Sequence, residues 1–455
     1  MSSGPRGART RASRKSPEPE HSWGGKPLNT LNRRGFLLAG GAAAAPSDRI
    51  NVGVVGVRSR GREHIEIFGS QPGARVAAVC DIDQAQAERA VQLTEKVQGS
   101  APKTYQDIRK MLDDKDIDAV SIATCNHWHA LATIWACQAG KDVYVEKPAS
   151  HNIFEGRKMV EAARKYGRIV QVGMQSRTTV HKQRAIELLR QGVIGKLYMA
   201  KGLCFKRRPS IGKSPDGPIP PGVNYDLWLG PAPMRPFNPN RFHYNWHWFW
   251  DTGNGDIGNQ GVHEMDICRW GLGKSTLPKN VFSSGGKYVY DDDQETPNTQ
   301  LATFEYDDGV LVFEVRGLLT GGESSIHWDG RNFIGNLFFG SEGFMSVDAW
   351  GYQIYLGEKR ELAQQMKAAE PRIWDTTPHI ENFLKAVRSR RHTDLTGDIL
   401  EGHLSAALCH MANISYRVGR KLALDAAKER FVGDAEANAL VSRPYRTPYV
   451  VPERV

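Results

Sequence analysis

Short runs of apolar and β-branched residues alternate with stretches of helical periodicity over residues 47–175. The runs predict strands and the periodic stretches predict helices. The predicted strands are residues 49–55, 76–80, 119–123 and 142–146, and the predicted helices between them are residues 63–70, 105–112 and 129–139. This alternation predicts a parallel, doubly wound sheet that binds its ligand at the carboxyl ends of the strands.

Residues 176–455 follow another pattern, in which alternating apolar and polar residues predict the strands of a second sheet. The alternating runs are residues 197–205, 299–306, 310–316 and 336–339. Asp307-Asp308-Gly309 separates two of these runs and is typical of a hairpin turn. Helices are predicted near residues 378–389 and 402–422, and an extended segment is predicted at residues 444–452.

Length and composition fit two folded domains after a leader of residues 1–46. The chain has 455 residues, of which 40% are hydrophobic and 24% are charged. No stretch approaches the roughly 20 apolar residues that cross a membrane, so no membrane span is predicted. The net charge of +10 is mostly local, because the leader holds eight Arg or Lys against two Glu. The rest is too dilute for a nucleic-acid partner.

The leader has its own sequence signals. Its first 31 residues are rich in Arg, Ser, Pro and Gly and are expected to be disordered. Arg33 and Arg34 then precede a short Ala/Gly-rich run at residues 39–45, which resembles a twin-arginine export signal. The protein is therefore expected to be exported to the periplasm. The alternative is a chance arginine pair on a flexible tail, and then a cytoplasmic protein.

The first predicted strand ends in a glycine turn, Gly56-Val57-Arg58-Ser59-Arg60-Gly61, which precedes a predicted helix. This order indicates dinucleotide binding, although Arg58 replaces the glycine that lets the backbone approach the pyrophosphate. Asp81 ends the second strand, where a carboxylate accepts hydrogen bonds from the adenosine ribose. Asp81 favours NAD because it would repel a 2′-phosphate, whereas Arg58 and Arg60 leave NADP open. An aspartate that only ends a strand is the alternative.

Two further strands carry polar motifs at their carboxyl ends. Ala123-Thr124-Cys125-Asn126, with His129 after it, follows one strand, and Glu146-Lys147-Pro148 follows the other. Together with the glycine turn and Asp81, these motifs have the order and spacing of the Gfo/Idh/MocA oxidoreductases, which the chain resembles from about Asp48 onward. The resemblance implies that Lys147 reaches the substrate hydroxyl and the nicotinamide, and that Pro148, often cis in the family, fixes the loop.

The resemblance also implies the cofactor and the fold class. The expected cofactor is NAD, tightly bound, with NADP as the alternative. The residues predicted to contact it are Gly56, Arg58, Ser59, Arg60, Gly61, Asp81, Thr124, Asn126, His129, Glu146 and Lys147. The implied fold class is α/β, with a Rossmann domain at residues 47–175 and an α+β domain at residues 176–455. The second domain would hold a large, open, mainly antiparallel sheet, whose uncovered face implies a homo-oligomer, a dimer or a tetramer.

Residues 253–270 form the predicted chemical centre of the second domain. If the later part is helical, Asn259, His263 and Asp266 share one face, with Asp256 near its start. The family has an aspartate and a histidine four residues apart here, and the histidine is the general acid and base. His263 matches this histidine and Asn259 replaces the aspartate, which leaves Asp256 and Asp266 as alternative carboxylates. A metal site is the weaker alternative, since His-x-x-Asp is poor ligand spacing, and no metal is predicted.

An aromatic segment at residues 241–251 precedes this centre. Clustered aromatic side chains usually pack in a core. Here His, Asn, Arg and Asp are interleaved with them, and each would need a partner if buried, so a loop that stacks on sugar rings fits better. The predicted substrate contacts are Lys147, Arg177, Tyr244, Trp246, Trp248, Asp256, Asn259 and His263.

Three functions compete. The first is a dehydrogenase that moves a hydride from a secondary hydroxyl of a sugar, polyol or glycoside to NAD, with Lys147 and His263 handling the proton and Asn259 tuning the site. The second is an NAD-dependent glycoside hydrolase or lyase that works through a transient keto-sugar without net redox change. The third is a ligand-binding relative without catalysis, which Arg58 and Asn259 favour and Lys147 and His263 oppose.

Overall fold

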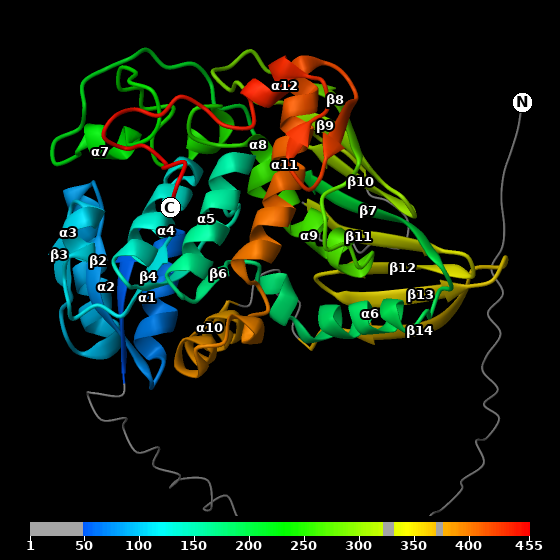
Figure 1. Cartoon of the computed structure of the whole chain (residues 1–455), viewed down its shortest axis with the longest axis horizontal. Coiled ribbons are helices and arrows are strands. Elements are labelled where there is room, and N and C mark those ends of the chain that lie inside the picture. Colours follow the sequence, from blue (N-terminus) through cyan, green and yellow to red (C-terminus); the bar gives the residue numbers. More distant parts are fainter. Residues whose placement is uncertain (1–48, 322–331, 370–375) are drawn as a thin grey trace, which may run out of the picture. The chain divides into compact units, whose positions relative to one another are not determined.

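The first half of the chain folds into a six-stranded parallel sheet with the order β3-β2-β1-β4-β5-β6 (Figure 1). In this computed structural model, residues 49–321, 332–369 and 376–455 are described. The leader, with its predicted export signal, lies outside the described residues. The strands of the first sheet are β1 Ile50–Val55, β2 Ala74–Cys80, β3 Lys103–Tyr105, β4 Ala119–Ile122, β5 Asp142–Val145 and β6 Val170–Val172.

Helices cover both faces of this sheet. They are α1 Arg60–Ser70, α2 Gln84–Gln98, α3 Ile108–Leu112, α4 Asn126–Gln138, α5 Ile153–Lys165 and, from near the end of the chain, α10 Thr377–Ser389. All residues of β4 and β5 are buried, as expected for parallel strands covered on both faces. The side chains of Asp83 and Asn152 accept hydrogen bonds from the first turns of α2 and α5 and so fix where these helices begin.

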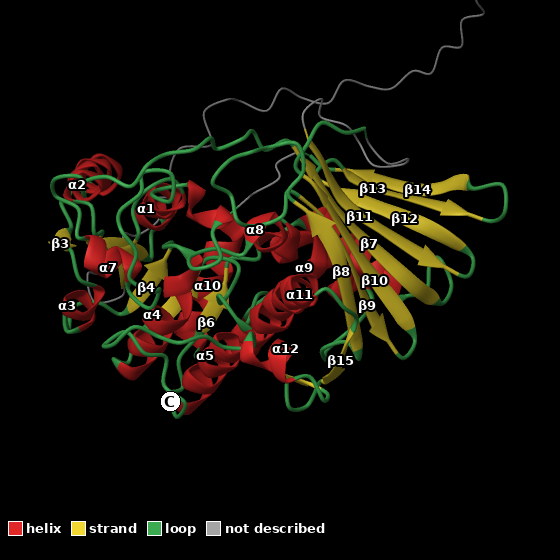
Figure 2. Ribbon diagram, turned by 90° about the horizontal axis from the view of Figure 1, so that it is seen from above, coloured by secondary structure: helices red, strands yellow, loops and turns green. Residues whose placement is uncertain are grey.

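The second half forms a ten-stranded sheet with the order β14-β13-β12-β11-β7-β10-β9-β8-β15-β16 (Figure 2). Its strands are β7 Leu197–Lys206, β8 Asn280–Gly286, β9 Thr299–Tyr306, β10 Gly309–Arg316, β11 Asn332–Gly340, β12 Gly343–Asp348, β13 Gly351–Leu356, β14 Glu361–Lys367, β15 Leu422–Asp425 and β16 Arg430–Phe431. Strands β7 and β10 pair in parallel and the other neighbours pair antiparallel. The predicted fold class is confirmed.

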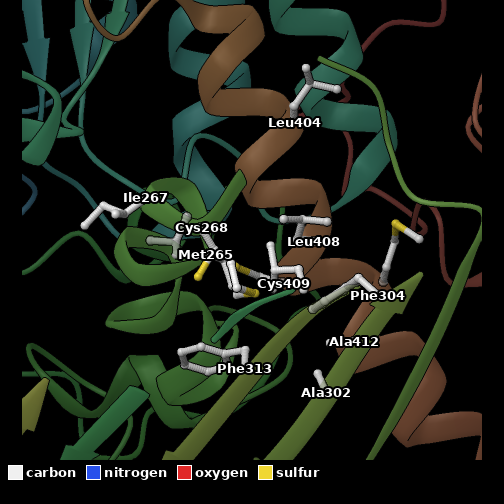
Figure 3. Close-up of a cluster of buried hydrophobic side chains, with 14 of the residues drawn as sticks. Met265, Ile267, Cys268, Ala302, Phe304, Phe313, Leu404, Leu408, Cys409 and Ala412 are labelled. Atoms are coloured by element: carbon white, nitrogen blue, oxygen red, sulfur yellow. The ribbon is translucent and has the colours of Figure 1, made fainter. Parts of the chain in front are cut away.

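Helices pack on one face of the second sheet, which alternates apolar residues toward them. Figure 3 shows this core, in which Met265 and Cys268 of α9 and Leu408 of α11 lie against Phe304 and Phe313 of the sheet. The remaining helices are η2 Gln175–Thr178, α6 Val180–Arg190, α7 Tyr225–Leu229, η3 Asn245–Trp248, α8 Gly255–Asn259, α9 Gly261–Gly271, η4 His392–Asp394, α11 Ile399–Val418 and α12 Ala435–Ala439. None of the described helices is long and apolar enough to span a membrane.

The structure corrects three predicted elements. Residues 105–112 are not one helix, because Tyr105 ends β3 and the helix begins at Ile108. The helix predicted at residues 402–422 is α11, which ends at Val418 because Gly419 adopts a left-handed φ of 69°. The polar stripe from Asp256 to Asp266 spans two helices, α8 and α9, with Gln260 between them.

Candidate active site

A cavity of about 520 Å³ lies at the carboxyl ends of β1, β2, β4 and β5, between the two halves of the chain. Its volume is in the range of small-molecule and cofactor sites, roughly 300–1,000 Å³. Most predicted site residues line it: Gly56, Arg58, Ser59, Arg60, Asp81, Thr124, Asn126, His129, Glu146, Lys147, Tyr244, Trp246, Asn259 and His263. The predicted residues that do not line it are Gly61, Arg177, Trp248 and Asp256.

The glycine turn between β1 and α1 needs both of its glycines. Gly56 has a φ of 77°, and a Cβ atom there would lie 2.8 Å from the carbonyl oxygen of Ala123. A Cβ atom on Gly61 would lie 1.9 Å from the carbonyl oxygen of Gly56, so Gly61 serves the close packing of helix on strand. Arg58 is exposed at the edge of the cavity, so the turn accommodates a side chain at the position of the second glycine.

Asp81 follows β2 and ties the turn to the sheet. One carboxylate oxygen accepts a hydrogen bond from the backbone N–H of Val57 at 2.8 Å, and the other accepts one from that of Asp83 at 3.0 Å. Burial raises the pKa of Asp81 to about 6, and these backbone hydrogen bonds oppose the shift. Asp83 and Asp107 line the same end of the cavity. This end is acidic, which suits a ribose with free hydroxyls better than one with a 2′-phosphate.

Glu146 holds a buried network in the wall of the cavity. Its Oε1 atom accepts a hydrogen bond from Arg60 Nε at 2.8 Å and lies 3.2 Å from His64 Nε2. Burial by itself would raise the pKa of Glu146, but the Arg60 charge and the contact with His64 hold that pKa well below its ordinary value. Arg60 also donates to Glu63 and Thr376, so its guanidinium binds protein groups in this structure.

Lys147 reaches from the first half of the chain into the second. The peptide bond before Pro148 is cis, in line with the resemblance described above. The Lys147 ammonium donates to the backbone oxygen of Asn259 at 2.6 Å and to its side-chain Oδ1 at 3.4 Å. Burial lowers the pKa of Lys147 to about 8; Glu146 opposes this shift, and the charges of Arg60, Lys206 and Arg208 add to it.

His129 and Asn126 fix the loops around Lys147. The ring of His129 lies 2.7 Å from the carbonyl oxygen of Pro148 through Nδ1 and 3.0 Å from that of Thr124 through Nε2. The side chain of Asn126 donates to Oδ1 of Asn254 at 2.9 Å, across the two halves of the chain. These residues were predicted to contact the cofactor, and they also set the geometry of the Lys147 loop.

His263 lies on α9 and is 2% exposed. Burial, followed by the positive charge of Lys147, lowers the pKa of His263 well below its ordinary value, so the imidazole is neutral at physiological pH. The sequence predicts that Asn259 orients this imidazole. In the structure, both oxygens of Asn259 accept hydrogen bonds from Lys147, so Asn259 acts on the lysine.

The alternative carboxylates, Asp256 and Asp266, are engaged elsewhere. Asp256 accepts two hydrogen bonds from Arg208, at 2.6 and 3.0 Å. Asp266 is 1% exposed and accepts hydrogen bonds from Arg177 at 2.8 and 2.9 Å and from Ser405 at 2.7 Å. Neither aspartate lines the cavity, so neither replaces the family's aspartate beside His263.

Arg177 was predicted to contact the substrate, but the structure places it outside the cavity. Its guanidinium donates to Asp266 and Glu401 and stacks over Trp270, and it does not line the cavity. Arg177 therefore fixes α9 to the rest of the second half, and the structure does not place it among the predicted substrate contacts that line the cavity. Among the described residues, no group of three His, Cys, Asp or Glu side chains is placed to hold a metal ion.

The aromatic segment divides between cavity and core. Tyr244 and Trp246 line the cavity, as predicted for substrate contacts. Trp248 is 4% exposed and lies beneath the guanidinium of Arg208, 5.2 Å from it, so the core interpretation holds for Trp248. His247 stacks on Trp246 with ring centroids 3.6 Å apart, and burial lowers its pKa to about 3, so it is neutral.

Several lining residues were not predicted as contacts, namely Gln175, Lys206, Arg208 and Trp228. Phe242, His243, His247 and Gln260 were covered only as parts of the aromatic segment and of the predicted chemical centre. A signal was present for two of the unpredicted residues. Lys206 and Arg208 follow directly on the strand predicted at residues 197–205, and charged residues at a strand end are candidates for a site at the sheet edge.

Similarity to solved structures supports the fold. The dehydrogenase WlbA from Bordetella pertussis, solved with NADH and UDP-GlcNAcA, matches with a TM-score of 0.61 and 21% identity over 83% of this chain and 99% of that protein. Levoglucosan dehydrogenase, solved with NADH, matches with a TM-score of 0.62 and 18% identity over 82% of this chain and 98% of that protein. At such identities the likeness shows the fold alone.

Two curated relatives carry different activities in their names. Glycosyl hydrolase family 109 protein 1 of Shewanella sp. (strain ANA-3) is 30% identical over 161 residues, and the match spans only 35% of that relative's length. Inositol 2-dehydrogenase 2 of Saccharopolyspora erythraea is 26% identical over 293 residues, which cover 61% of this chain and 73% of the relative.

Family models match most of the chain. Residues 50–174 match the oxidoreductase family model described as an NAD-binding Rossmann fold. Residues 204–338 and 339–451 match the model of the same family's C-terminal alpha/beta domain. Because these matches cover more than half of the chain, the chain belongs to the Gfo/Idh/MocA oxidoreductase family.

Proposed function

We propose that the protein oxidises a secondary hydroxyl of a sugar, polyol or glycoside with NAD as the hydride acceptor. The observation that carries this proposal is the buried ammonium of Lys147, which lines the cavity and bonds to Asn259 across the two halves. A lysine with a pKa of about 8 is partly neutral near physiological pH, so it can take up the proton that a hydroxyl loses on oxidation.

The residues fit an NAD-binding role. Gly56 and Gly61 leave no room for side chains in the turn, and the acidic end around Asp81 favours NAD over NADP. NAD, when bound, supplies the hydride acceptor. Trp228, Phe242 and His243 of the second half line the cavity together with Asp81 and Asp83 of the first. Because both halves would enclose the cofactor, we infer that it is held tightly.

Lys147 and His263 divide the proton chemistry in this proposal. Lys147 accepts the hydroxyl proton in its neutral form, while Asn259 holds its nitrogen in place. His263, neutral and buried, offers a hydrogen-bonding group for the same hydroxyl. The stacked Trp246 and His247 give the sugar ring a flat apolar surface.

A transient-oxidation hydrolase or lyase is the second candidate. The similarity over 161 residues to glycosyl hydrolase family 109 proteins and the enclosing cavity favour it. Such an enzyme returns the hydride, so the same Lys147 and His263 would serve both chemistries.

One experiment separates these functions. Cofactor released from purified protein is identified by mass spectrometry, and the protein is assayed with a panel of sugars, polyols and aryl glycosides. NADH accumulation supports the dehydrogenase, and glycoside cleavage without NADH accumulation supports the second candidate. Absence of bound cofactor and of both activities would contradict both.

We also propose export by the twin-arginine route, on the basis of Arg33-Arg34 and the Ala/Gly-rich run after them. Replacing both arginines with lysine should keep a reporter fusion in the cytoplasm. Continued export of the variant through that route would refute the proposal.

A homo-oligomer, formed through the outer face of the second sheet, is a further part of the proposal. Phe282 and Leu301 on that face are 42% and 44% exposed, and Phe344 stacks on Tyr355 there with centroids 4.8 Å apart. Exposed apolar patches of this kind mark interaction surfaces. Light scattering should give a dimer or tetramer, and Leu301→Lys should shift it toward the monomer; a monomeric wild type would contradict the proposal.

A further inference from the structure

Lys206 ends β7 on the face that the helices cover. Side chains alternate along a strand, and Ala200, Gly202 and Cys204 of the same row are buried against the helix layer. A Cβ atom on Gly202 would lie 3.0 Å from Cβ of Glu264 on α9. At the end of this row, past the helix layer, Lys206 lines the cavity.

The ammonium of Lys206 has no counter-ion in the part of the chain that the structure describes. Two carboxylates, Asp256 and Glu264, act on its charge, and Asp256 gives both oxygens to Arg208, at 2.6 and 3.0 Å. Glu264 accepts a hydrogen bond from Gln260 at 3.2 Å. Burial, followed by repulsion from Arg208, lowers the pKa of Lys206, with Asp256 opposing the shift.

The substrate end of the cavity therefore carries surplus positive charge. Three cations, Lys147, Lys206 and Arg208, line this end. Asp256 behind them pairs with Arg208, and Glu146 is paired with Arg60. The two histidines that line this end, His247 and His263, are neutral at physiological pH. A half-buried ammonium without a partner is costly unless a ligand supplies the opposite charge.

We propose that the substrate is an anionic sugar whose carboxylate binds the ammonium of Lys206. This inference rests on the proposed function and names its substrate class. The guanidinium of Arg208 already donates hydrogen bonds to Asp256 and to the hydroxyl oxygen of Tyr244, so it is not free to bind a second carboxylate through two nitrogens. In the proposed function Lys147 acts as a neutral base, so Lys206 is the one spare ammonium at this end. It balances one negative charge, which fits the carboxylate of a sugar acid rather than the dianion of a sugar phosphate.

The test compares matched probes that differ in one group. The NAD-loaded protein is titrated by calorimetry, and assayed for NADH formation, with D-glucuronate, D-glucose, D-galacturonate, D-galactose and D-glucose 6-phosphate. Each uronate is expected to bind roughly 10- to 100-fold more tightly than its neutral partner and than the phosphate, the size of one charge-assisted hydrogen bond. Lys206→Gln should remove that preference.

Lys201→Gln is the matched control. Lys201 lies on the same strand but on the opposite face, where it pairs with Glu314 at 3.4 Å, so its loss should leave the preference unchanged. Lys206→Gln gives a second readout, since loss of its charge should raise the pKa of Lys147 and move the pH–rate limb upward. An unmoved limb would contradict the placement of Lys206.

The outcomes separate this inference from the proposed function. Oxidation of neutral sugars without any preference for uronates refutes the anion site and leaves the dehydrogenase intact. Uronate binding that depends on Lys206, without oxidation, supports the anion site and contradicts the dehydrogenase. Tighter binding of D-glucose 6-phosphate than of the uronates also refutes the carboxylate site. So does a loss of the uronate preference in Lys201→Gln that equals the loss in Lys206→Gln.

Discussion

The two ends of the cavity are built in opposite ways. At the cofactor end, the glycine turn and Asp81 lie on neighbouring strands, and the carboxylate bonds directly to the backbone of Val57 in the turn. At the substrate end, Lys147, Lys206 and His263 come from three separate parts of the chain and meet only in the folded protein. The cofactor end is acidic, and the substrate end carries surplus positive charge.

Because the two ends are built differently, substitutions at each end should impair different properties of the protein. Loss of a group at the cofactor end should weaken NAD binding, because that group holds the turn. Loss of a group at the substrate end should slow the chemical step and leave NAD affinity nearly unchanged. Each variant below tests whether the two ends are separable in this way.

Lys147→Ala should have the largest effect. General acid–base catalysis usually contributes this much, so kcat of Lys147→Ala should fall roughly 10²- to 10⁴-fold. The kcat of His263→Ala should fall by a factor in the same range. In the wild type, oxidation needs the neutral amine, so kcat should rise with pH through about 8, the pKa of Lys147. NAD affinity, measured by calorimetry, should change little.

Lys147→Arg is the informative companion of this variant. Arginine keeps the positive charge but does not lose its proton near pH 8, so kcat should stay low if Lys147 transfers a proton. Full activity of Lys147→Arg, or of His263→Ala, would remove that residue from the proton chemistry.

Arg177→Met tests the support of the substrate end. It would leave the buried carboxylate of Asp266 without its main partner, which typically costs about 3–5 kcal/mol of folding free energy. Burial alone would raise the pKa of Asp266, but Arg177 holds it below its ordinary value. The stabilisation by Asp266 is therefore present at neutral pH and is lost as the pH falls through that lowered pKa.

Denaturant titrations of wild type and Arg177→Met at pH 7 and at pH 3 measure this effect. The difference between the two proteins should shrink at the lower pH. Asp116→Asn, which removes an exposed partner of Lys103, is the control and should have little effect. A stable Arg177→Met protein that has lost only substrate affinity would restore Arg177 as a substrate contact.

Sequence reasoning predicted the cofactor end better than the substrate end, for a physical reason. The glycine turn occupies six consecutive residues, and Asp81 follows at a spacing that the fold dictates. Whether Asp256 points into the cavity or pairs with Arg208 depends on contacts between distant segments, which no local pattern encodes. The same holds for Asn259, which was predicted to tune the site beside His263 and whose oxygens bond to Lys147.

Two helices of the first half, α2 and α5, escaped prediction, and for α2 the reason is related. The buried stripe of α2, Gln84–Gln98, consists of Ala87, Ala90 and Thr94, which are small or polar residues. An apolar periodicity made of such residues gives a weak helical signal. The alternating runs of β9, by contrast, place Ala302 and Phe304 on the covered face, and their bounds were predicted as observed.

Asp81→Ala should weaken the cofactor end alone. Loss of its hydrogen bonds to the ribose and to Val57 should reduce NAD affinity roughly 10- to 100-fold, the size of one or two charge-assisted hydrogen bonds. Because the pKa of Asp81 is about 6, NAD affinity of the wild type should also fall as the pH drops through that value.

Asp118→Asn is the matched control for Asp81. Its carboxylate also accepts a hydrogen bond from a backbone N–H of β1, that of Asn51 at 2.8 Å, but at the amino end of the sheet. Calorimetry should find NAD affinity unchanged in this variant. An equal loss of NAD affinity in both variants would mean that Asp81 acts only through the stability of the sheet. If the wild type bound NADP more tightly than NAD, the contact of Asp81 with the ribose would be refuted.

Asn259→Asp should give the smallest effect and the sharpest test of the substrate end. The new carboxylate would lie beside the Lys147 ammonium, where Oδ1 of Asn259 is 3.4 Å from it, and a negative charge favours the protonated lysine. The pKa of Lys147 should rise from about 8, so the limb on which kcat increases with pH should move upward by about one unit. NAD affinity should stay the same, since Asn259 lies at the other end of the cavity. A pH–rate series on wild type, Asn259→Asp and Asn259→Ala measures this shift, and Asn259→Ala, which adds no charge, should leave the limb near its original position. An unmoved limb in Asn259→Asp would show that Lys147 does not control the rate on that limb.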